Sequence, residues 1–398
     1  MWARWASALV VLLIAGCSTN AGATPAVAVN SVLASARPVA TVSPSLAPVG
    51  WAQTYGSDLA ELHDVVAGPH GLAAVGCAAD LSGNCLEGLL LTSPDGSTWT
   101  KVDLAGAADT RIWRVRQAGG RLFAIGDQVE DAKAEVRAAV WVSHDGSSWQ
   151  AIDSPSFTDR SVEDVIASPA GTLAVGIHAP YSSEGYGVVV WDISAQDAFG
   201  LPRDVRATDG PATLAGAVWT GDRYLAWGPC GPCPSGDHVT STVLAVSADG
   251  RTWRALPTIA AFHGSSVGQI LATASGLVAV GRRGTASPTE PRAWTSSDGA
   301  TWQAAAVPTG QGALGTVGLE AGLLVARGNE PVGDERRSLT WISVDGASWT
   351  RLPAGVDMPD LTGYDAASRA TVGARACVAG TFYGRENQLE PRAAIYCR

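Results

Sequence analysis

Ser296-Ser297-Asp298-Gly299-Ala300-Thr301-Trp302 is the stretch that decides the fold, because the chain repeats its pattern. Four further copies keep the Ser, the Asp-Gly pair, a Ser or Thr and the Trp at the same offsets, over residues 93–99, 143–149, 247–253 and 343–349. The steps between successive Trp residues are 50, 104, 49 and 47 residues, so the long step holds one degenerate copy, near 188–194. A regular period of this length indicates a repeat architecture.

Each copy reads as a tight turn that joins two strands. The Asp side chain accepts backbone N–H groups, the Gly supplies a positive φ, and the Ser or Thr satisfies further backbone groups. The Trp begins the next strand and packs between neighbouring sheets. We therefore expect a structural role for the turn residues Asp95, Trp99, Asp145, Trp149, Asp249, Trp253, Asp298, Trp302, Asp345 and Trp349.

The remainder of each repeat fits a four-stranded blade. A glycine ends the second strand of each repeat, and seven copies of this signal set the number of blades: Gly76, Gly126, Gly176, Gly228, Gly281, Gly328 and Gly380. The last repeat stops at its third strand, Ala393–Cys397, whereas Trp51–Thr54 reads as a fourth strand without a repeat of its own. We predict an all-β, seven-bladed β-propeller over residues 49–398, in which the N-terminal strand closes the last blade and removes exposed edges.

The turns resemble the Asp-box of sialidase-type (BNR) propellers, whose pattern is Ser-x-Asp-x-Gly-x-Thr-Trp. In this chain Gly follows Asp directly, one residue short, so we expect a tighter turn. The resemblance implies that the Asp-box turns are remote from any active site. It places a site on the opposite face, where the inner strands begin.

The N-terminus has the features of an export signal. Arg4 precedes a short apolar run, and Ile14-Ala15-Gly16-Cys17 resembles a bacterial lipobox. This resemblance implies a lipoprotein signal peptide over 1–16 and lipidation of Cys17, followed by an Ala/Ser/Pro-rich tether that extends to residue 48. The alternative is an ordinary signal peptide with an incidental Cys17. Either case predicts an extracytoplasmic protein, and the lipobox adds a membrane anchor.

The other six cysteines fall into three local couples: Cys77 with Cys85, Cys230 with Cys233, and Cys377 with Cys397. An oxidising compartment favours disulfides in these couples. Cys230-Gly231-Pro232-Cys233 resembles the active-site tetrapeptide of thioredoxin-like oxidoreductases. It leads into a loop rather than a helix, so we interpret it as a loop clip, with a redox role as the alternative.

Polar residues gather where the inner strands begin. Counting back twelve residues from the glycines gives Asp64, Arg114, Asp164 and Gln269, and His63 and Glu163 come just before two of these positions. Tyr364 and Asp365 are placed at the comparable point of the last blade. These eight residues form a candidate ligand-binding site at the mouth of the channel. The alternative is a solvated ring of mutually paired charges.

These features predict a non-catalytic module that binds a glycan or a protein of the cell envelope, as a monomer, with no cofactor. The six histidines show no spacing typical of a metal site. A net charge of −10 without a basic stripe argues against nucleic acid as a partner. The alternative is a sialidase-like glycoside hydrolase with a diverged site, which by resemblance needs three arginines around one carboxylate. Arg137, Arg337 and Arg392 align with one another, although on the outer part of the blades.

Overall fold

The computed structural model describes residues 50–81, 83–130, 135–178, 187–205, 213–229, 241–257, 259–284, 289–333, 335–361, 363–382 and 391–398, without the side chains of 129, 130, 135 and 364–367. The chain divides into two units, Met1–Ser45 and Leu46–Arg398, and all described residues belong to the second. The described part is almost entirely β, with 64% strands and 2% helix. The predicted signal peptide and tether, Cys17, Cys230 and Cys233 lie outside the described residues.

The strands assemble into four-stranded antiparallel sheets in chain order. The first sheet contains β2 (Ala60–Gly68), β3 (Gly71–Ala79), β4 (Cys85–Ser93) and β5 (Thr100–Lys101). The next set contains β6 (Thr110–Ala118), β7 (Arg121–Glu130), β8 (Glu135–Ser143) and β9 (Gln150–Ile152), followed by the short 3-10 helix η1 (Pro155–Phe157). A single parallel pairing of Arg160 with Arg137 joins this set to β10 (Arg160–Ser168), β11 (Gly171–His178), β12 (Gly187–Ile193) and β13 (Arg203–Val205).

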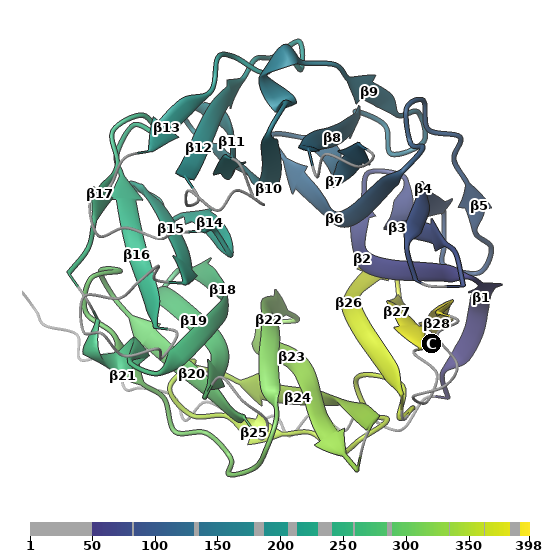
Figure 1. The fold of residues 1–398 in the computed structure, drawn as a ribbon. Coiled ribbons are helices and arrows are strands. Elements are labelled where there is room, and N and C mark those ends of the chain that lie inside the picture. Colours follow the sequence, from purple (N-terminus) through teal and green to yellow (C-terminus); the bar gives the residue numbers. More distant parts are fainter. Residues whose placement is uncertain are drawn as a thin grey trace, which may run out of the picture. The chain divides into compact units, whose positions relative to one another are not determined.

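Three further sheets repeat the arrangement. One contains β14 (Gly216–Trp219), β15 (Tyr224–Pro229), β16 (Thr242–Ser247) and β17 (Arg254–Ala255), followed by η2 (Ala260–Phe262). Another contains β18 (Ser265–Thr273), β19 (Gly276–Arg283), β20 (Glu290–Ser296) and β21 (Gln303–Ala304). The third contains β22 (Ala313–Glu320), β23 (Leu323–Val332), β24 (Glu335–Ser343) and β25 (Thr350–Arg351). In Figure 1 the sheets stand around a common centre, with the first strand of each nearest to it.

The last sheet combines two distant parts of the sequence. Strands β26 (Tyr364–Val372), β27 (Arg375–Phe382) and β28 (Arg392–Cys397) pair in order, and β1 (Ala52–Asp58) adds antiparallel to β28. The register pairs Ala52 with Cys397 and Asp58 with Arg392. This is the pairing that the sequence predicts for the segment beginning at Trp51.

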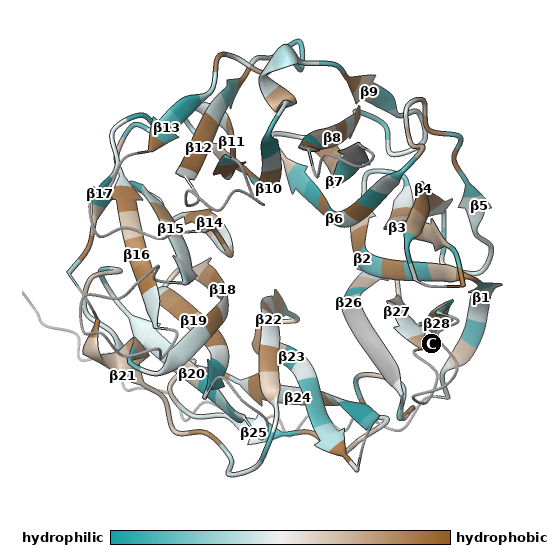
Figure 2. Ribbon diagram, in the orientation of Figure 1, coloured by the Kyte–Doolittle hydropathy of each residue, from teal (hydrophilic) through white to brown (hydrophobic). Residues whose placement is uncertain are grey.

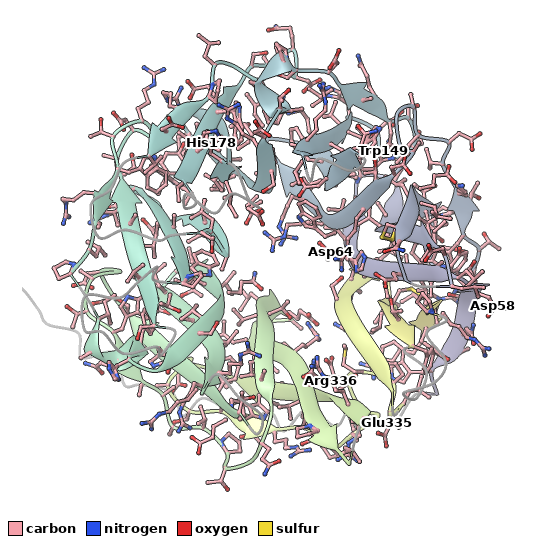
Figure 3. The ribbon with its side chains drawn as sticks, in the orientation of Figure 1. Asp58, Asp64, Trp149, His178, Glu335 and Arg336 are labelled. Atoms are coloured by element: carbon pink, nitrogen blue, oxygen red, sulfur yellow. A yellow bond between two sulfur atoms is a disulfide. The ribbon has the colours of Figure 1, made fainter. Side chains whose placement is uncertain are left out.

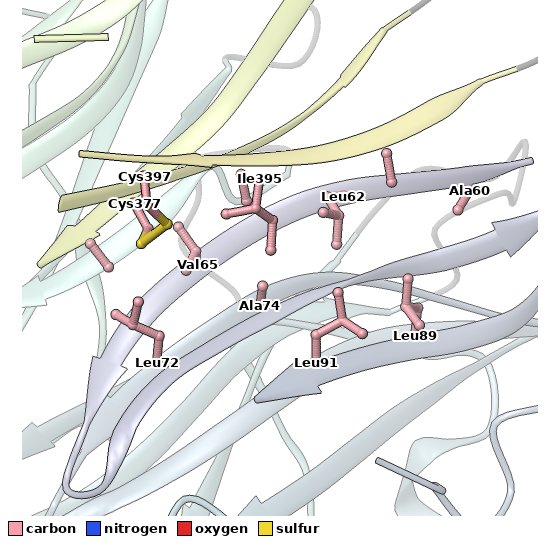
Figure 4. Packing of buried hydrophobic residues seen from close by; sticks show 13 residues of the cluster. Ala60, Leu62, Val65, Leu72, Ala74, Leu89, Leu91, Cys377, Ile395 and Cys397 are labelled. Atoms are coloured by element: carbon pink, nitrogen blue, oxygen red, sulfur yellow. A yellow bond between two sulfur atoms is a disulfide. The ribbon is translucent and has the colours of Figure 1, made fainter. Parts of the chain in front are cut away.

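Apolar side chains fill the spaces between neighbouring sheets, and Figure 2 shows hydrophobic residues along strands such as β12, β16 and β18. Leu62, Leu72 and Leu91 of the first sheet pack with Ile395 and Cys397 of the last sheet in one buried cluster (Figure 4). Third strands contribute the largest of the fully buried side chains, which the sequence analysis did not predict as core: Trp141, Trp191, Trp294 and Trp341.

The repeated turns have the predicted internal bonding. In the copy at 143–149, Asp145 Oδ1 accepts the N–H groups of Ser147 and Ser148 at 2.8 and 2.7 Å, and Ser143 Oγ accepts that of Gly146 at 2.8 Å. Gly146 has a φ of 75°, in the left-handed region that favours glycine. The Trp residues of the five turns all pack against the core, and Trp302 and Trp349 are buried.

We expect these turns to make the fold sensitive to acid. Hydrogen bonds from Ser148 and then Ser147 lower the pKa of Asp145, and turn hydrogen bonds lower the pKa of the other four aspartates likewise. A lowered folded-state pKa stabilises the fold above the unfolded value of about 3.9, and this contribution is lost as the pH falls through the folded value. The melting temperature should therefore fall below about pH 4. Asp145→Asn should reduce that fall, compared with the control Asp103→Asn, and an unchanged acid profile would contradict this assignment.

Two of the predicted disulfides are confirmed. Cys77–Cys85 links β3 to β4 with Cα atoms 5.5 Å apart, and Cys377–Cys397 links β27 to β28 at 4.1 Å. None of the helices in the described part of the chain is long and apolar enough to cross a membrane.

Candidate functional site

A β-bulge in the strands nearest the centre explains the repeated glycines, and it occurs in β2, β6, β10, β18, β22 and β26. In β2 the register shifts between Leu62 and Asp64, so that His63 is the extra residue and Asp64 pairs with Val75. The bulge brings the backbone against the following Gly76, where a Cβ would lie 1.8 Å from the Glu61 carbonyl oxygen. Glycine is therefore required at this position, and similar close approaches occur at Gly126, Gly176, Gly228, Gly281 and Gly328.

The bulges locate most of the predicted site residues. Equivalent shifts place Arg114, Asp164, Gln269 and Thr316 at the position of Asp64. Glu163 is the extra residue of its bulge, as His63 is in β2. The prediction for the last sheet was wrong: Ser368, paired with Ala379, occupies this position. Tyr364 and Asp365 lie near the start of β26, because the twelve-residue count from Gly380 reaches Ser368, and their side chains are not described.

Several of these side chains connect one sheet to the next. Asp64 Oδ2 accepts the N–H of Val115 at 3.0 Å, Gln269 Oε1 accepts that of Val317 at 2.9 Å, and Ser368 Oγ accepts that of Val65 at 2.5 Å. A bulge disrupts the hydrogen-bond ladder locally, and these side chains accept backbone N–H groups of the neighbouring sheet. Asp64 (Figure 3) and Gln269 therefore have a structural function, whatever they bind.

A charge network adjoins this position on the second and third sheets. Arg116 lies between two carboxylates: its Nη1 is 2.9 Å from Asp64 Oδ2, and its Nε is 3.0 Å from Asp164 Oδ1. Arg114 Nη1 donates to the Glu163 carbonyl oxygen at 2.5 Å and lies 3.7 Å from Asp164 Oδ2. Burial lowers the pKa of Arg114, whereas Asp164 and Asp64 outweigh burial and raise the pKa of Arg116. The sequence analysis missed Arg116, which follows Arg114 by two residues in the same strand.

Near this network lie two acidic side chains, the buried Asp127 and the partly buried Glu163. Burial raises the pKa of Glu163, although the Ser161 hydroxyl donates to its Oε1 at 2.7 Å. Burial, and then the charge of Glu163, raise the pKa of Asp127 well above its ordinary value. No described group hydrogen-bonds to Asp127 Oδ1. Asp164 also lines a neighbouring cavity, whereas Glu163 and Asp127 do not.

A cavity of about 400 Å³ lies beside the network, lined by residues of β6, β10, β14, β15, β18 and β22. Small residues contribute to its lining, at places where the first three sheets have His63, Trp113 and Glu163: Ala215, Gly268 and Gly315. Its lining includes three charged side chains from β6 and β10, Arg114, Arg116 and Asp164, and the apolar or aromatic side chains of Trp219, Trp227 and Leu271 from β14, β15 and β18. Trp227 is 3% exposed, and no described group accepts its indole N–H.

His63 lies apart from this cavity. Its Nε2 accepts from Arg111 Nε at 3.3 Å and lies 3.2 Å from Glu61 Oε2. The Cys77 and Cys85 sulfurs belong to the same group of potential metal ligands, whose atoms lie within 4.8 Å of one another. The sequence predicted no metal site, because these four residues come from three strands that only the sheet brings together.

The three arginines that occupy equivalent positions in the repeats do not lie around one point. Arg137 pairs with Asp153 at 2.5 Å, Arg337 with Glu330 at 2.7 Å and Arg392 with Asp58 at 3.3 Å. None of the three lines the cavity. The three-arginine arrangement that the sialidase alternative needs is therefore not formed by these residues.

Comparison with known proteins concerns the fold alone. No protein-family model and no curated protein matches the chain. Among solved structures, the acylaminoacyl peptidase of Pyrococcus horikoshii, in its orthorhombic crystal form, aligns with a TM-score of 0.50 and 11% identity over 81% of this chain and 49% of that chain. The chain thus spans about half the length of the first peptidases that it matches.

Two other structures align with lower scores. The β-propeller domain of the Trilobed protease from Pyrococcus furiosus has a TM-score of 0.49 and 9% identity, over 84% of this chain and 93% of that domain. The phage phi92 endosialidase has a TM-score of 0.47 and 11% identity, over 87% and 68% of the two chains. The described part of this chain is a β-propeller module.

Proposed function

We propose that this chain is an exported, lipid-anchored, seven-bladed β-propeller that binds a small polar ligand in its cavity without transforming it. Seven sets of four strands support the blade count; the two sets joined by the single Arg160–Arg137 pairing are counted as two blades. The pairing of β1 with β28, and the cluster that joins the first sheet to the last, support closure of the ring. The lipobox-like segment that ends at Cys17 supports the anchor and an extracytoplasmic location.

The mixture of charged and apolar residues that line the cavity carries the binding proposal. Its volume of about 400 Å³ lies in the range of small-molecule sites, about 300–1,000 Å³. Trp219 and Leu271, which are partly exposed, offer apolar surface in the lining, and Arg114, Arg116 and Asp164 offer hydrogen-bonding groups. A pyranose sugar has an apolar ring face and polar hydroxyl groups. We therefore assign the ligand to this class, as a monosaccharide unit of an envelope glycan.

The charges around the cavity favour binding over hydrolysis. A glycoside hydrolase ordinarily uses two carboxyl groups that flank the scissile bond. Among the described residues that line the cavity, Asp164 is the only carboxylate, and it is engaged by both arginines. The second carboxyl group that hydrolysis requires is therefore missing from the described lining.

Gly315→Leu tests the proposal by filling the cavity. Gly315 lines it, has a φ outside the left-handed region, and a Cβ there would meet only the Arg327 carbonyl oxygen, at 4.0 Å. Trp113 occupies the corresponding bulge position of β6, so a large side chain is compatible with the fold. Gly318→Leu is the matched control, because it lies on the same strand, outside the cavity, with no atom within 4 Å of an added Cβ.

Calorimetric titration with glucose, N-acetylglucosamine, galacturonate and N-acetylneuraminate should show saturable binding of at least one sugar. Gly315→Leu should weaken that binding at least about tenfold, a change of about 1.4 kcal/mol, and Gly318→Leu should not. The corresponding fluorogenic glycosides should not be cleaved. Equal binding by the parent and Gly315→Leu, or turnover that Asp164→Ala abolishes, would overturn the proposal.

A further inference from the structure

Four potential metal ligands lie close together at one end of the first sheet, and none of them lines the cavity. Glu61 and His63 lie two positions apart on β2, Cys77 lies opposite Glu61 on β3, and Cys85 begins β4. Directly opposite residues of an antiparallel pair have Cβ atoms about 4.5–5.5 Å apart, so the sheet itself brings these side chains together. The bulge in β2 adds His63 to the group.

The donor set has the chemistry of a zinc site. Cys thiolate, His nitrogen and Glu oxygen are the ligands of tetrahedral Zn²⁺, at about 2.0–2.3 Å from the metal. The four donor atoms lie within 4.8 Å of one another, so an adjustment of about an ångström would bring them to these distances. The site is enclosed but reachable, because the His63 and Glu61 side chains are 12% and 9% exposed. Arg111, which donates to His63, is largely exposed and can move aside.

The disulfide determines whether the set is complete. In the structure the two sulfurs are bonded to each other, which leaves only His63 and Glu61 as ligands. Metal-binding cysteines act as thiolates. Reduction of Cys77–Cys85 would therefore raise the number of available ligands from two, His63 and Glu61, to four.

We propose that Glu61, His63, Cys77 and Cys85 form a Zn²⁺ site that opens when the Cys77–Cys85 disulfide is reduced and closes when it is re-formed. An external dithiol supplies the two electrons: one of its thiolates attacks a cysteine sulfur to form a mixed disulfide, and its second thiolate displaces that cysteine. The dithiol leaves as its own disulfide, and both cysteines become thiols. Binding of Zn²⁺ then releases the two thiol protons to solvent.

The test uses the full-length protein carrying Cys230→Ser and Cys233→Ser, so that those two residues contribute no thiolates. After reduction with dithiothreitol and its anaerobic removal, Co²⁺ should produce thiolate-to-cobalt charge-transfer bands and the visible bands of a tetrahedral ion. Adding Cys77→Ser and Cys85→Ser should abolish both signals while leaving Cys377 and Cys397 as an internal control. Signals of equal size in this variant would overturn the proposal.

Ligand variants and reoxidation provide independent readouts. His63→Ala and Glu61→Gln should each weaken Zn²⁺ binding to the reduced protein by about 10–100-fold or more, because loss of a residue that only hydrogen-bonds to a metal ligand already weakens binding by that factor. His70→Ala should leave the affinity unchanged. The oxidised variants should melt at the temperature of the oxidised parent, which separates loss of a ligand from loss of the fold. Oxidised glutathione should release Zn²⁺ from the parent as the disulfide re-forms. Unchanged affinity in both variants, or retention of Zn²⁺ after reoxidation, would refute the site.

Discussion

Asp357→Ala should lower the free energy of unfolding by about 3–5 kcal/mol, because it leaves two buried arginines, Arg327 and Arg369, to share the single carboxylate of Glu320. Asp357 lies between β25 and β26, where its Oδ2 is 2.6 Å from Arg327 Nε and its Oδ1 is 3.6 Å from Arg369 Nε. The three side chains are each 8% exposed. Arg327 belongs to β23 and Arg369 to β26, so the network joins the last two sheets.

Two comparisons make the Asp357 experiment specific. Asp360→Ala removes an exposed carboxylate three residues away and should change stability by less than about 0.5 kcal/mol. Asp357→Asn keeps hydrogen-bonding atoms for Arg327 and the Thr340 hydroxyl, which lies 3.1 Å from Oδ2, and should cost less than Asp357→Ala. Chemical denaturation measures all three. A loss below about 1 kcal/mol for Asp357→Ala would show that this network does not hold the two sheets together.

Trp302→Ala should also be strongly destabilising, by about 3–5 kcal/mol, as large-to-small changes at buried tryptophans are. Trp302 is 6% exposed, its indole N–H donates to the Gly299 carbonyl oxygen at 3.0 Å, and its ring centroid is 5.2 Å from that of Phe262. Truncation removes both the packing between sheets and the hydrogen bond that fastens the turn.

Trp253→Ala is the matched control for Trp302→Ala. Trp253 has the same place in its turn and the same hydrogen bond, to Gly250 at 3.1 Å, but remains partly exposed. It should therefore cost less, because less apolar surface is removed from the core. Equal losses in the two variants would show that burial of Trp302 does not determine its contribution.

Local signals in the sequence predicted the strands, turns and disulfides well, because each depends on residues close in the chain. The turn chemistry of Asp145 and Gly146, and the pairing of Cys377 with Cys397 on adjacent strands, are of this kind. The glycines of the second strands were recognised as a pattern, but they do not end these strands as predicted, since β3 continues past Gly76 to Ala79. Their physical cause, the close approach of the bulged strand seen at Gly76, emerged only in the structure.

The site depends on contacts between sheets, which local patterns do not specify. Arg116 was missed because its partners, Asp64 and Asp164, come from two other strands. The cavity was missed because it arises where side chains are small, as at Gly268 and Gly315, rather than from any motif. One signal was available: Arg327 occupies a position that is apolar in the other repeats, so its buried charge required a partner such as Asp357.

Titration of the four sugars into the parent protein and into Gly315→Leu, side by side, tests the central claim most directly. The account predicts saturable binding to the parent that is at least about tenfold weaker in the filled-cavity variant, with Gly318→Leu unchanged. Binding of equal strength in all three proteins, or by none of them, would contradict a sugar-binding site in this cavity.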